Sequence, residues 1–406
     1  MAEKPYEVKE KTEYFFPIYK CDTVRETMEL LKKKLGDRKA LFVLDREYDE
    51  LINNRLSDTV KEFFDEESNG IISLYPRKNG CENKDHESLF MILDKLIDMD
   101  LPRDGVIVGI GGGVITDIAG FAARQFRRMV DFVRVPTTLL GQIDASVGIK
   151  VGINYNGNKN ILGAFYAPLF VINCREFLYD LDDINFNSGI SEMLKAGIVE
   201  SSVIIDGLRE RRYNAPLLRN DAFAMESFDI ITDESVDVMK RIIMDDPEEK
   251  SFGVRSMDLG HTFSLSYEAI SGYKMPHGYA VAAEVVICAY ISRALGLLSL
   301  EEMRVYEKIF LKYDLLKYYD MIYPEIKEIF DKTVDKIVSH RAGNLNLVLP
   351  ESGCKASFCN LFGTKDENRA GCRVLLTKDE LRSLYCGGAD MANELAKGKY
   401  RNKALR

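Results

Sequence analysis

Residues 105–121 read GVIVGIGGGVITDIAGF, and this stretch decides which class of fold we predict. It begins as an apolar, β-branched strand, reaches three consecutive glycines at 111–113, and continues with the apolar spacing of a helix. Glycines at a strand-to-helix turn allow backbone N–H groups and the helix N-terminus to approach a pyrophosphate. The stretch therefore indicates a dinucleotide or phosphate site. It departs from the usual GxGxxG, so a tight turn without a ligand is the alternative.

Strands and helices alternate on both sides of this stretch. Short apolar runs predict strands at 40–44, 71–75, 106–110, 132–135 and 170–173. Helical periodicity predicts helices at about 23–35, 48–64, 87–99 and 115–126. This alternation is typical of a mostly parallel, buried sheet. After residue 187 helical periodicity replaces the strands, so we predict an α/β plus α protein with a Rossmann-like domain at 1–183 and a mostly helical domain at 184–406.

The composition narrows the possible partners. Hydrophobic residues make up 46% of the 406 residues and charged residues 29%, as in ordinary globular proteins. The net charge of -9 makes nucleic acid an unfavourable partner, whereas a local basic cluster can still bind a small anion. No signal-peptide pattern or membrane-spanning apolar run is evident, so we expect a cytoplasmic protein. The eight cysteines form no CxxC pair, which favours reduced thiols over disulfides or a zinc site among the four at 354–386.

A second stretch combines small residues with charge. Residues 135–160 read VPTTLLGQIDASVGIKVGINYNGNKN, and we expect them to form a Gly-rich loop. This loop carries Asp144, Lys150, Lys159 and Asn160, and fixed lysine charges with an amide suit a phosphate monoester. An ordinary solvated loop is the alternative. Asp45, just past the strand at 40–44, could accept hydrogen bonds from a ribose.

Two of the four histidines lie close together in the sequence. His261 and His277 occur in DLGHTFSLSYEAISGYKMPHGYAV, 16 residues apart. With Glu192 of SEMLKAG they would form a Glu/His/His set, which suits zinc with coordination positions left for substrate oxygens. Histidines that are satisfied by ordinary hydrogen bonds are the alternative.

Six motifs in order resemble those of the sugar phosphate cyclases, the dehydroquinate synthase superfamily. They are GGGVITDIAGF, VPTTLLGQIDASVGIK, NKNILGAFY, SEMLKAGIVE, DLGHTF and PHGYAV, and the resemblance covers roughly residues 40–345. It implies an NAD-binding N-terminal domain, a helical C-terminal domain and a divalent metal, usually zinc with cobalt possible. It also implies an active site in the cleft between the domains and a homodimer.

Matching the motifs position by position assigns candidate roles. The resemblance implies that the metal ligands are Glu192, His261 and His277. The resemblance implies cofactor contacts at Lys84, Gly112, Gly113, Val114, Asp117, Thr137, Thr138, Leu140 and Lys159, and Asp45 is a further candidate from its place after the strand at 40–44. Candidate catalytic residues are Asp144, Lys150, Lys195 and Asp258. Candidate substrate and phosphate contacts are Asn160, Lys240, Arg341 and Arg128, the last matching an arginine that reaches the phosphate in a partner subunit.

The family chemistry implied by this resemblance eliminates phosphate and closes a carbocycle. NAD oxidises a hydroxyl, the metal polarises its oxygen, phosphate leaves, the ketone is reduced again, and an aldol addition closes the ring. Dehydroquinate synthases carry LNxGHTxGHAxE, whereas this chain has Asp258 for the Asn, Leu265 for the second His, and Val254 where an Arg would meet the substrate carboxylate.

These departures, and HRAG at 340–343, resemble cyclases of sedoheptulose 7-phosphate, so we expect that substrate. A buried carboxylate without a cationic partner is costly, which is why these positions bear on substrate choice. The alternative is a 3-dehydroquinate synthase. A metal-dependent alcohol or glycerol dehydrogenase and a non-catalytic binding protein are further alternatives.

Overall fold

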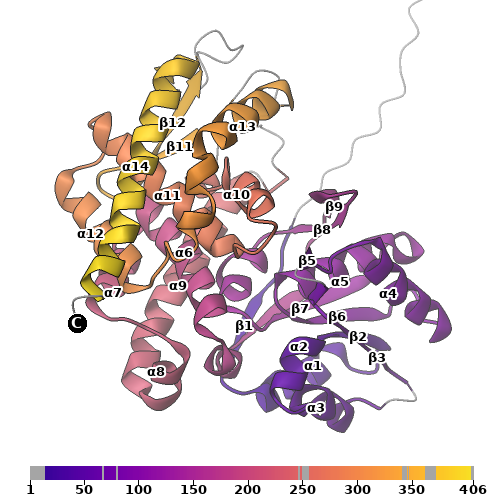
Figure 1. The fold of residues 1–406 in the computed structure, drawn as a ribbon. Coiled ribbons are helices and arrows are strands. Elements are labelled where there is room, and N and C mark those ends of the chain that lie inside the picture. The colour runs from indigo at the N-terminus through magenta and orange to yellow at the C-terminus, as the bar shows by residue number, and fades with distance from the viewer. Residues whose placement is uncertain are drawn as a thin grey trace, which may run out of the picture.

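The computed structural model describes residues 14–65, 68–78, 81–245, 247–248, 256–340, 345, 347–361 and 372–403. The chain folds into two halves that lie side by side (Figure 1). The first half, indigo to magenta, is an open sheet with helices on both faces, and the second half, pink to yellow, is mostly helical. The predicted α/β plus α class is confirmed.

A six-stranded sheet forms the centre of the first half, and all its described neighbours pair in parallel. In spatial order the strands are β1 (Ile18–Cys21), β10 (Phe170–Cys174), β7 (Asp131–Pro136), β6 (Val106–Gly111), β2 (Ala40–Asp45) and β3 (Gly70–Leu74). The five predicted strands are present within one residue at each end. Strand β1 was not predicted, because its alternating IYKC carries only a weak strand signal.

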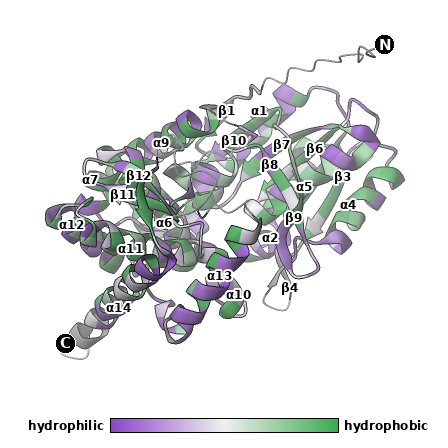
Figure 2. Ribbon diagram, turned by 90° about the horizontal axis from the view of Figure 1, so that it is seen from above, coloured by the Kyte–Doolittle hydropathy of each residue, from purple (hydrophilic) through white to green (hydrophobic). Residues whose placement is uncertain are grey.

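Alternate side chains of the strands enter two separate cores. Phe42 and Leu44 pack under α1 (Val24–Leu35) and α3 (Arg55–Phe63), whereas Leu41 and Val43 pack under α4 (His86–Asp98) and α5 (Gly113–Gln125). A strand that is buried on both faces has apolar residues at every position. This explains the sequence ALFVL at residues 40–44 of β2. Figure 2 shows the hydrophobic strands enclosed between helices with mixed surfaces.

Two predictions about the first half are wrong. The helix expected at 48–64 is divided into α2 (Arg46–Leu51) and α3, because Asn53 and Asn54 adopt positive φ of 56° and 60° between them. The expected loop at 135–160 is instead a short π-helical turn (Gly141–Ala145) followed by an antiparallel hairpin, β8 (Lys150–Tyr155) and β9 (Asn158–Phe165). The short strands β4 (Arg77–Lys78) and β5 (Cys81–Glu82) also pair antiparallel.

Two long buried helices form the centre of the second half, α6 (Asp183–Glu200) and α11 (His277–Ala294). The surrounding helices are α7 (Ser202–Glu210), α8 (Ala215–Asn220), α9 (Ala222–Asp245), α10 (Ser264–Ile270), α12 (Leu300–Lys312), α13 (Ile326–His340) and α14 (Lys378–Lys403). A three-stranded sheet that was not predicted adds β11 (Leu347–Glu351), β12 (Lys355–Leu361) and β13 (Cys372–Leu376).

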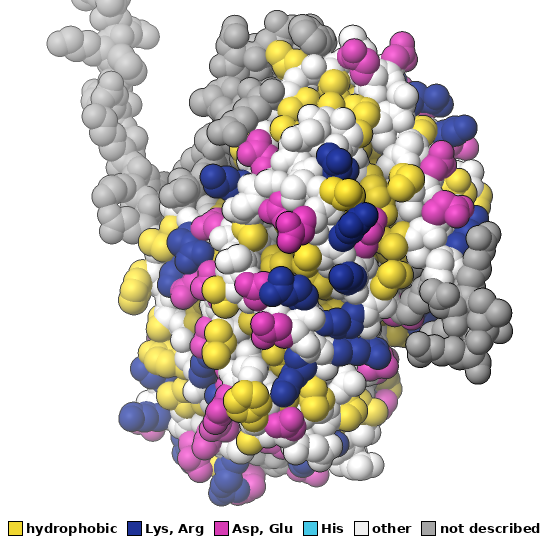
Figure 3. Space-filling view, turned by 90° about the vertical axis from the view of Figure 1, so that its left-hand side faces the viewer, with side chains coloured by type: hydrophobic (Ala, Val, Ile, Leu, Met, Phe, Trp, Pro, Cys, Tyr) yellow, Lys and Arg dark blue, Asp and Glu magenta, His cyan; other side chains and the backbone are white. Residues whose placement is uncertain are grey.

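The surface charge, the helices and the cysteines agree with what the composition indicated. On the face shown in Figure 3, Lys and Arg side chains are interspersed with Asp and Glu, as on an ordinary solvated surface. Among the helices of the described residues, none combines the length and apolar character that a membrane span requires. Free thiols are found at Cys21, Cys174, Cys288, Cys354, Cys359 and Cys386.

Candidate functional site

A cleft of about 1500 Å³ is lined by both halves of the chain. The first half contributes the glycine turn, the segment 137–152 and the hairpin β8–β9, and the second half contributes α6, α9 and the residues around His261 and His277. This volume exceeds the roughly 300–1000 Å³ of a pocket for one drug-sized ligand. The cleft is therefore large enough for a dinucleotide together with a second small molecule.

The glycine turn presents backbone N–H groups to this cleft. Helix α5 begins after Gly112, an N-cap residue that has no side chain to accept hydrogen bonds from the first N–H groups of the helix. A Cβ atom at Gly112 would meet only the side chain of Thr138, at 3.3 Å, so the space beside the turn is open. Asp45 lies beside the turn at the end of β2, and burial raises the pKa of its carboxyl to about 6. Uncapped N–H groups at the start of a helix are suited to bind phosphate oxygens.

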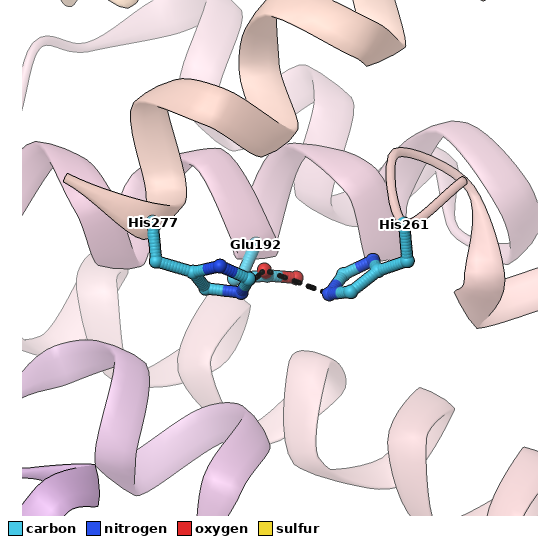
Figure 4. A group of neighbouring side chains, drawn as sticks. All are labelled: Glu192, His261 and His277. Carbon is cyan, nitrogen blue, oxygen red and sulfur yellow. Dashed lines mark ion pairs between the residues drawn. The ribbon is translucent and has the colours of Figure 1, made fainter. Parts of the chain in front are cut away.

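Three side chains from separate elements converge at the other end of the cleft. Glu192 comes from the middle of α6, His277 is the first residue of α11, and His261 lies in the turn before α10 (Figure 4). Nε2 of His277 is 3.4 Å and Nε2 of His261 is 3.8 Å from Oε1 of Glu192. One potential ligand atom from each residue lies within 4.8 Å of the others, which is the spacing that a single metal ion can bridge.

The buried charges around this triad are strongly coupled. Burial acts to raise the pKa of Glu192, but Lys195, His277 and His261 outweigh it and hold the pKa well below its usual range. Burial, followed by the charge of Lys195, lowers the pKa of His261 to about 3, so its ring is neutral and can ligate a metal. Burial also acts against the charge of Lys195, yet Glu192 and Asp144 raise its pKa and keep the amine protonated. Burial, followed by Glu192, raises the pKa of Asp144 to about 6.

A polar cluster joins the glycine helix to the hairpin. Buried Lys84 lies 2.6 Å from Asp117 Oδ2 and 2.8 Å from Asn160 Oδ1. Arg134 is fully buried in β7 and donates to the carbonyl oxygens of Ala145, Gly148 and Lys150 at 2.6–3.0 Å. Arg134 therefore fixes the backbone between Asp144 and Lys150, the segment that supplies two candidate catalytic side chains.

Most of the residues predicted from the sequence line this one cleft. These are Asp45, Lys84, Gly112, Gly113, Val114, Asp117, Thr137, Thr138, Leu140, Asp144, Lys150, Lys159, Asn160, Lys195, Asp258, His261 and His277. Glu192 lies directly behind the two histidines and is buried.

Three predicted residues are not placed at the cleft. Lys240 is exposed on α9 and pairs with Asp237, and Arg128 is exposed in the turn after α5. Arg341 lies outside the described residues, as does Val254. The proximity of the other residues does not by itself assign them roles, so those roles stay predictions.

Sequence reasoning missed three buried residues that support the site. They are Arg134, Glu268, which contacts His277, and Glu284, whose carboxylate accepts the backbone N–H groups of Thr262, Phe263 and Ser264 at 2.7–2.9 Å. The signal for Glu284 was present, because an acidic residue inside the apolar run VAAEVVICAY needs buried partners. Arg134 gave the same signal, because it stands inside the apolar run FVRV, and Glu268 stands at the last position of the LNxGHTxGHAxE motif.

Comparison with known protein families assigns both halves of the chain. The family described as "3-dehydroquinate synthase N-terminal" matches residues 75–188, and the family described as "3-dehydroquinate synthase C-terminal" matches residues 189–336. The 3-dehydroquinate synthase of Shewanella sp. (strain MR-4) is 32% identical over 344 residues, which are 82% of this chain and 90% of that protein. The chain belongs to the 3-dehydroquinate synthase family, and the expectation of a phosphate-eliminating cyclase of the dehydroquinate synthase superfamily is confirmed at the level of that family.

Other relatives match over shorter or more divergent ranges. The 3-dehydroquinate synthase of Pyrococcus furiosus is 40% identical over 217 residues, so that match spans 53% of this chain and 62% of that protein. Among solved structures, the 2-epi-5-epi-valiolone synthase ValA of Streptomyces hygroscopicus subsp. jinggangensis 5008, with NAD⁺ and Zn²⁺ bound, aligns with a TM-score of 0.80. It is 22% identical, and the alignment covers 95% of this chain and 100% of that one, so it shows a shared fold.

Proposed function

We propose that this protein is an NAD- and metal-dependent cyclase that eliminates phosphate from a seven-carbon sugar phosphate. One observation carries the proposal, the convergence of the glycine turn, the lysine-bearing segment 144–160 and the Glu192–His261–His277 triad on one cleft. A dehydrogenase needs only the turn and the triad. The several lysines at the cleft give an anionic phosphate the counter-charges that it requires.

The residues of the triad fit a divalent cation. Neither carboxylate oxygen of buried Glu192 accepts a well-formed hydrogen bond within the described part of the chain, although Lys195 and His277 approach them as ion pairs. A buried carboxylate normally has such partners, and one carboxylate with two imidazoles is a common ligand set for zinc. We propose that these three side chains hold the metal and that the turn at Gly112 and Gly113 holds the pyrophosphate of NAD.

The residues around the triad can handle protons near neutral pH. When bound, NAD would take up and return a hydride, and the metal would polarise the oxygen at the reacting carbon. Asp144, with its pKa raised to about 6, can accept and release a proton close to neutrality. Lys195 keeps its charge and can hold a developing negative oxygen, while Lys150 and Asn160 line the side of the cleft that we assign to phosphate.

We propose that the substrate is the carboxylate-bearing heptulosonate phosphate and that the product is 3-dehydroquinate. Relatives that carry the name 3-dehydroquinate synthase, at 30–40% identity, support this choice better than our expectation of sedoheptulose 7-phosphate. The sequence also places Arg255 three residues before Asp258, where a guanidinium could pair with the carboxylate.

Sedoheptulose 7-phosphate stays as a second candidate because of two side chains at the cleft. Asp258 and Leu265 both line it, and Leu265 is 50% exposed. A carboxylate and an apolar side chain suit a neutral hydroxymethyl group better than a substrate carboxylate.

The kcat/KM values for the two substrates distinguish these candidates. The proposal predicts at least a tenfold preference for the carboxylate-bearing substrate, and a preference of similar size for sedoheptulose 7-phosphate would favour the second candidate. The double variant Asp258→Asn, Leu265→His provides a matched comparison. If these two residues select against a carboxylate, it should gain kcat/KM on the carboxylate-bearing substrate, whereas unchanged values would show that they do not select.

We also propose that the protein is a homodimer in which Arg128 serves the partner's phosphate site. Arg127, Arg128 and Met129 have positive φ of 49°, 68° and 140°, a strained run that needs a local reason. Arg127 is bound to Asp100, which follows α4, whereas Arg128 is exposed and is not among the residues that line the cleft. Light scattering should give a dimer mass, and Arg128→Ala should raise KM for the sugar phosphate at unchanged mass. A monomer with full activity would contradict the proposal.

A further inference from the structure

Glu268 contacts both the Glu192–His261–His277 triad and the hairpin β8–β9, which belongs to the first half of the chain. It lies on α10, and its side chain is 3% exposed. One carboxylate oxygen, Oε1, is 2.9 Å from Nδ1 of His277. The other, Oε2, pairs with Nζ of Lys159 in β9. A single buried carboxylate therefore bridges a proposed metal ligand and a lysine that comes from the first half of the chain.

The contact with His277 determines which ring nitrogen can ligate a metal. The carboxylate oxygen that faces Nδ1 is an acceptor, so Nδ1 carries the proton and donates to Glu268. Nε2 is then the nitrogen directed toward Glu192 and the cleft, 3.4 Å from the Glu192 carboxylate. A carboxylate behind a ligating imidazole also increases the basicity of the ring, which strengthens the bond to a metal.

The contact with Lys159 fixes the hairpin against the second half. Lys159 is only 14% exposed at its side chain, and its amine also lies 5.7 Å from the ring centre of Tyr273. Strand β9 is otherwise largely exposed along its length. An ion pair with a buried carboxylate is therefore a strong local restraint on a strand that has little packing of its own.

We propose that Glu268 is a positioning residue with two effects, orienting His277 for metal binding and holding the hairpin β8–β9 over the cleft through Lys159. The proposal rests on the metal site of the proposed function. The two effects use different oxygens of one carboxylate, so different substitutions separate them.

Three variants and one control separate the effect on His277 from the effect on the hairpin. Glu268→Ala removes both contacts. Glu268→Gln keeps an acceptor for His277 but removes the charge that Lys159 pairs with. Lys159→Met keeps the His277 contact alone. Glu307→Gln is the control, because Glu307 accepts a hydrogen bond from Tyr290 on α11 and is absent from the cleft lining.

Two readouts other than activity report the effects. Co²⁺ titration of the metal-free protein, followed by the visible absorption of the bound ion, should show a 10- to 100-fold weaker affinity in Glu268→Ala. Glu268→Gln should recover most of that loss, and Lys159→Met should stay within about threefold of the wild type. Hydrogen exchange across 150–165 should accelerate in all three variants and not in Glu307→Gln.

The outcomes distinguish this inference from the proposed function. Wild-type protein that binds no Co²⁺ would contradict the proposed metal site itself. Wild-type binding together with unchanged affinity in Glu268→Ala would contradict only the orientation of His277 by Glu268. Unchanged exchange of the hairpin in Lys159→Met would contradict the restraint. If Glu268→Ala fails to fold, Glu268→Met, which also removes the acceptor but keeps the volume, replaces it in the Co²⁺ titration, and Lys159→Met still tests the restraint.

Discussion

A Cβ atom placed on Gly278 would lie 2.4 Å from the Cα atom of Ser188, so α11 crosses α6 with the two backbones in contact. Gly278 directly follows His277, and Ser188 lies one turn before Glu192 on α6. The absence of a side chain at Gly278 is thus what allows the two helices to bring the His277 imidazole to the Glu192 carboxylate.

Gly278→Ala should therefore damage stability and metal binding together. The methyl group meets backbone atoms that cannot rotate away, and such overpacking typically costs about 1–3 kcal/mol. Gly387→Ala on α14 is the matched control, because nothing lies within 4 Å of its Cβ position. The control should be neutral or more stable by up to about 1 kcal/mol. Thermal melting and metal content measure both effects, and normal metal content in Gly278→Ala would contradict this role of the crossing.

His261→Ala should remove the metal and turnover together. His261 supplies one of only two imidazoles of the triad, and its neutral ring offers Nε2 to an ion. His86→Ala is the control, since His86 is exposed at the start of α4 and contacts aromatic rings outside the triad. Elemental analysis of the purified variants decides the matter. Full metal occupancy in His261→Ala would rule out the assigned ligand set.

The affinity for NAD should fall as the pH is lowered through the pKa of Asp45. Burial raises that pKa to about 6, and only the ionised carboxylate can accept hydrogen bonds from both hydroxyls of a ribose. At pH 5, one unit below the pKa, roughly a tenth of Asp45 is ionised, so binding should be about tenfold weaker than at pH 7.5. Calorimetric titration at both pH values, with Asp45→Asn as the control, tests this. An equal pH dependence in Asp45→Asn would assign the effect to another group.

Arg134→Met should destabilise the fold strongly. The substitution keeps the apolar stem but leaves the carbonyl oxygens of Ala145, Gly148 and Lys150 without their buried donor. Leaving a buried acceptor without its donor typically costs about 1–3 kcal/mol, and this substitution affects three of them. Arg124→Met, at an exposed position on α5, should cost less than about 0.5 kcal/mol. Denaturant titrations of both variants provide the comparison, and a similar small loss in both would show that Arg134 does not fix the segment.

The parts of the fold that sequence could predict are those in which local pattern and burial agree. The run ALFVL is apolar because both faces of β2 are covered, so its strand was evident. The hairpin β8–β9 was missed because Gly152 and Gly163 read as loop residues. They occur there because the paired backbones approach too closely for side chains, with a Cβ on Gly152 only 2.7 Å from the Leu162 carbonyl oxygen.

In the candidate site too, local sequence patterns predicted some features, whereas others depend on tertiary packing. The identity of Glu192, His261 and His277 could be proposed from motifs, but their convergence depends on the crossing of α6 and α11, which no local pattern encodes. The supporting contact of Glu268 depends on a hairpin from the other half of the chain and could not be predicted from the neighbouring residues. Roles that follow from chain-wide packing therefore required the structure.

The central claim is that the protein eliminates phosphate while NAD is regenerated, and one assay tests it directly. The metal-loaded protein with catalytic NAD should be given each heptulose phosphate while inorganic phosphate, the cyclic product and absorbance of NADH are followed together. We expect phosphate and carbocycle to appear in equal amounts over many turnovers, with no net NADH. If one NADH accumulated for each substrate molecule consumed and no phosphate were released, the protein would be a dehydrogenase and the proposed phosphate elimination would be wrong.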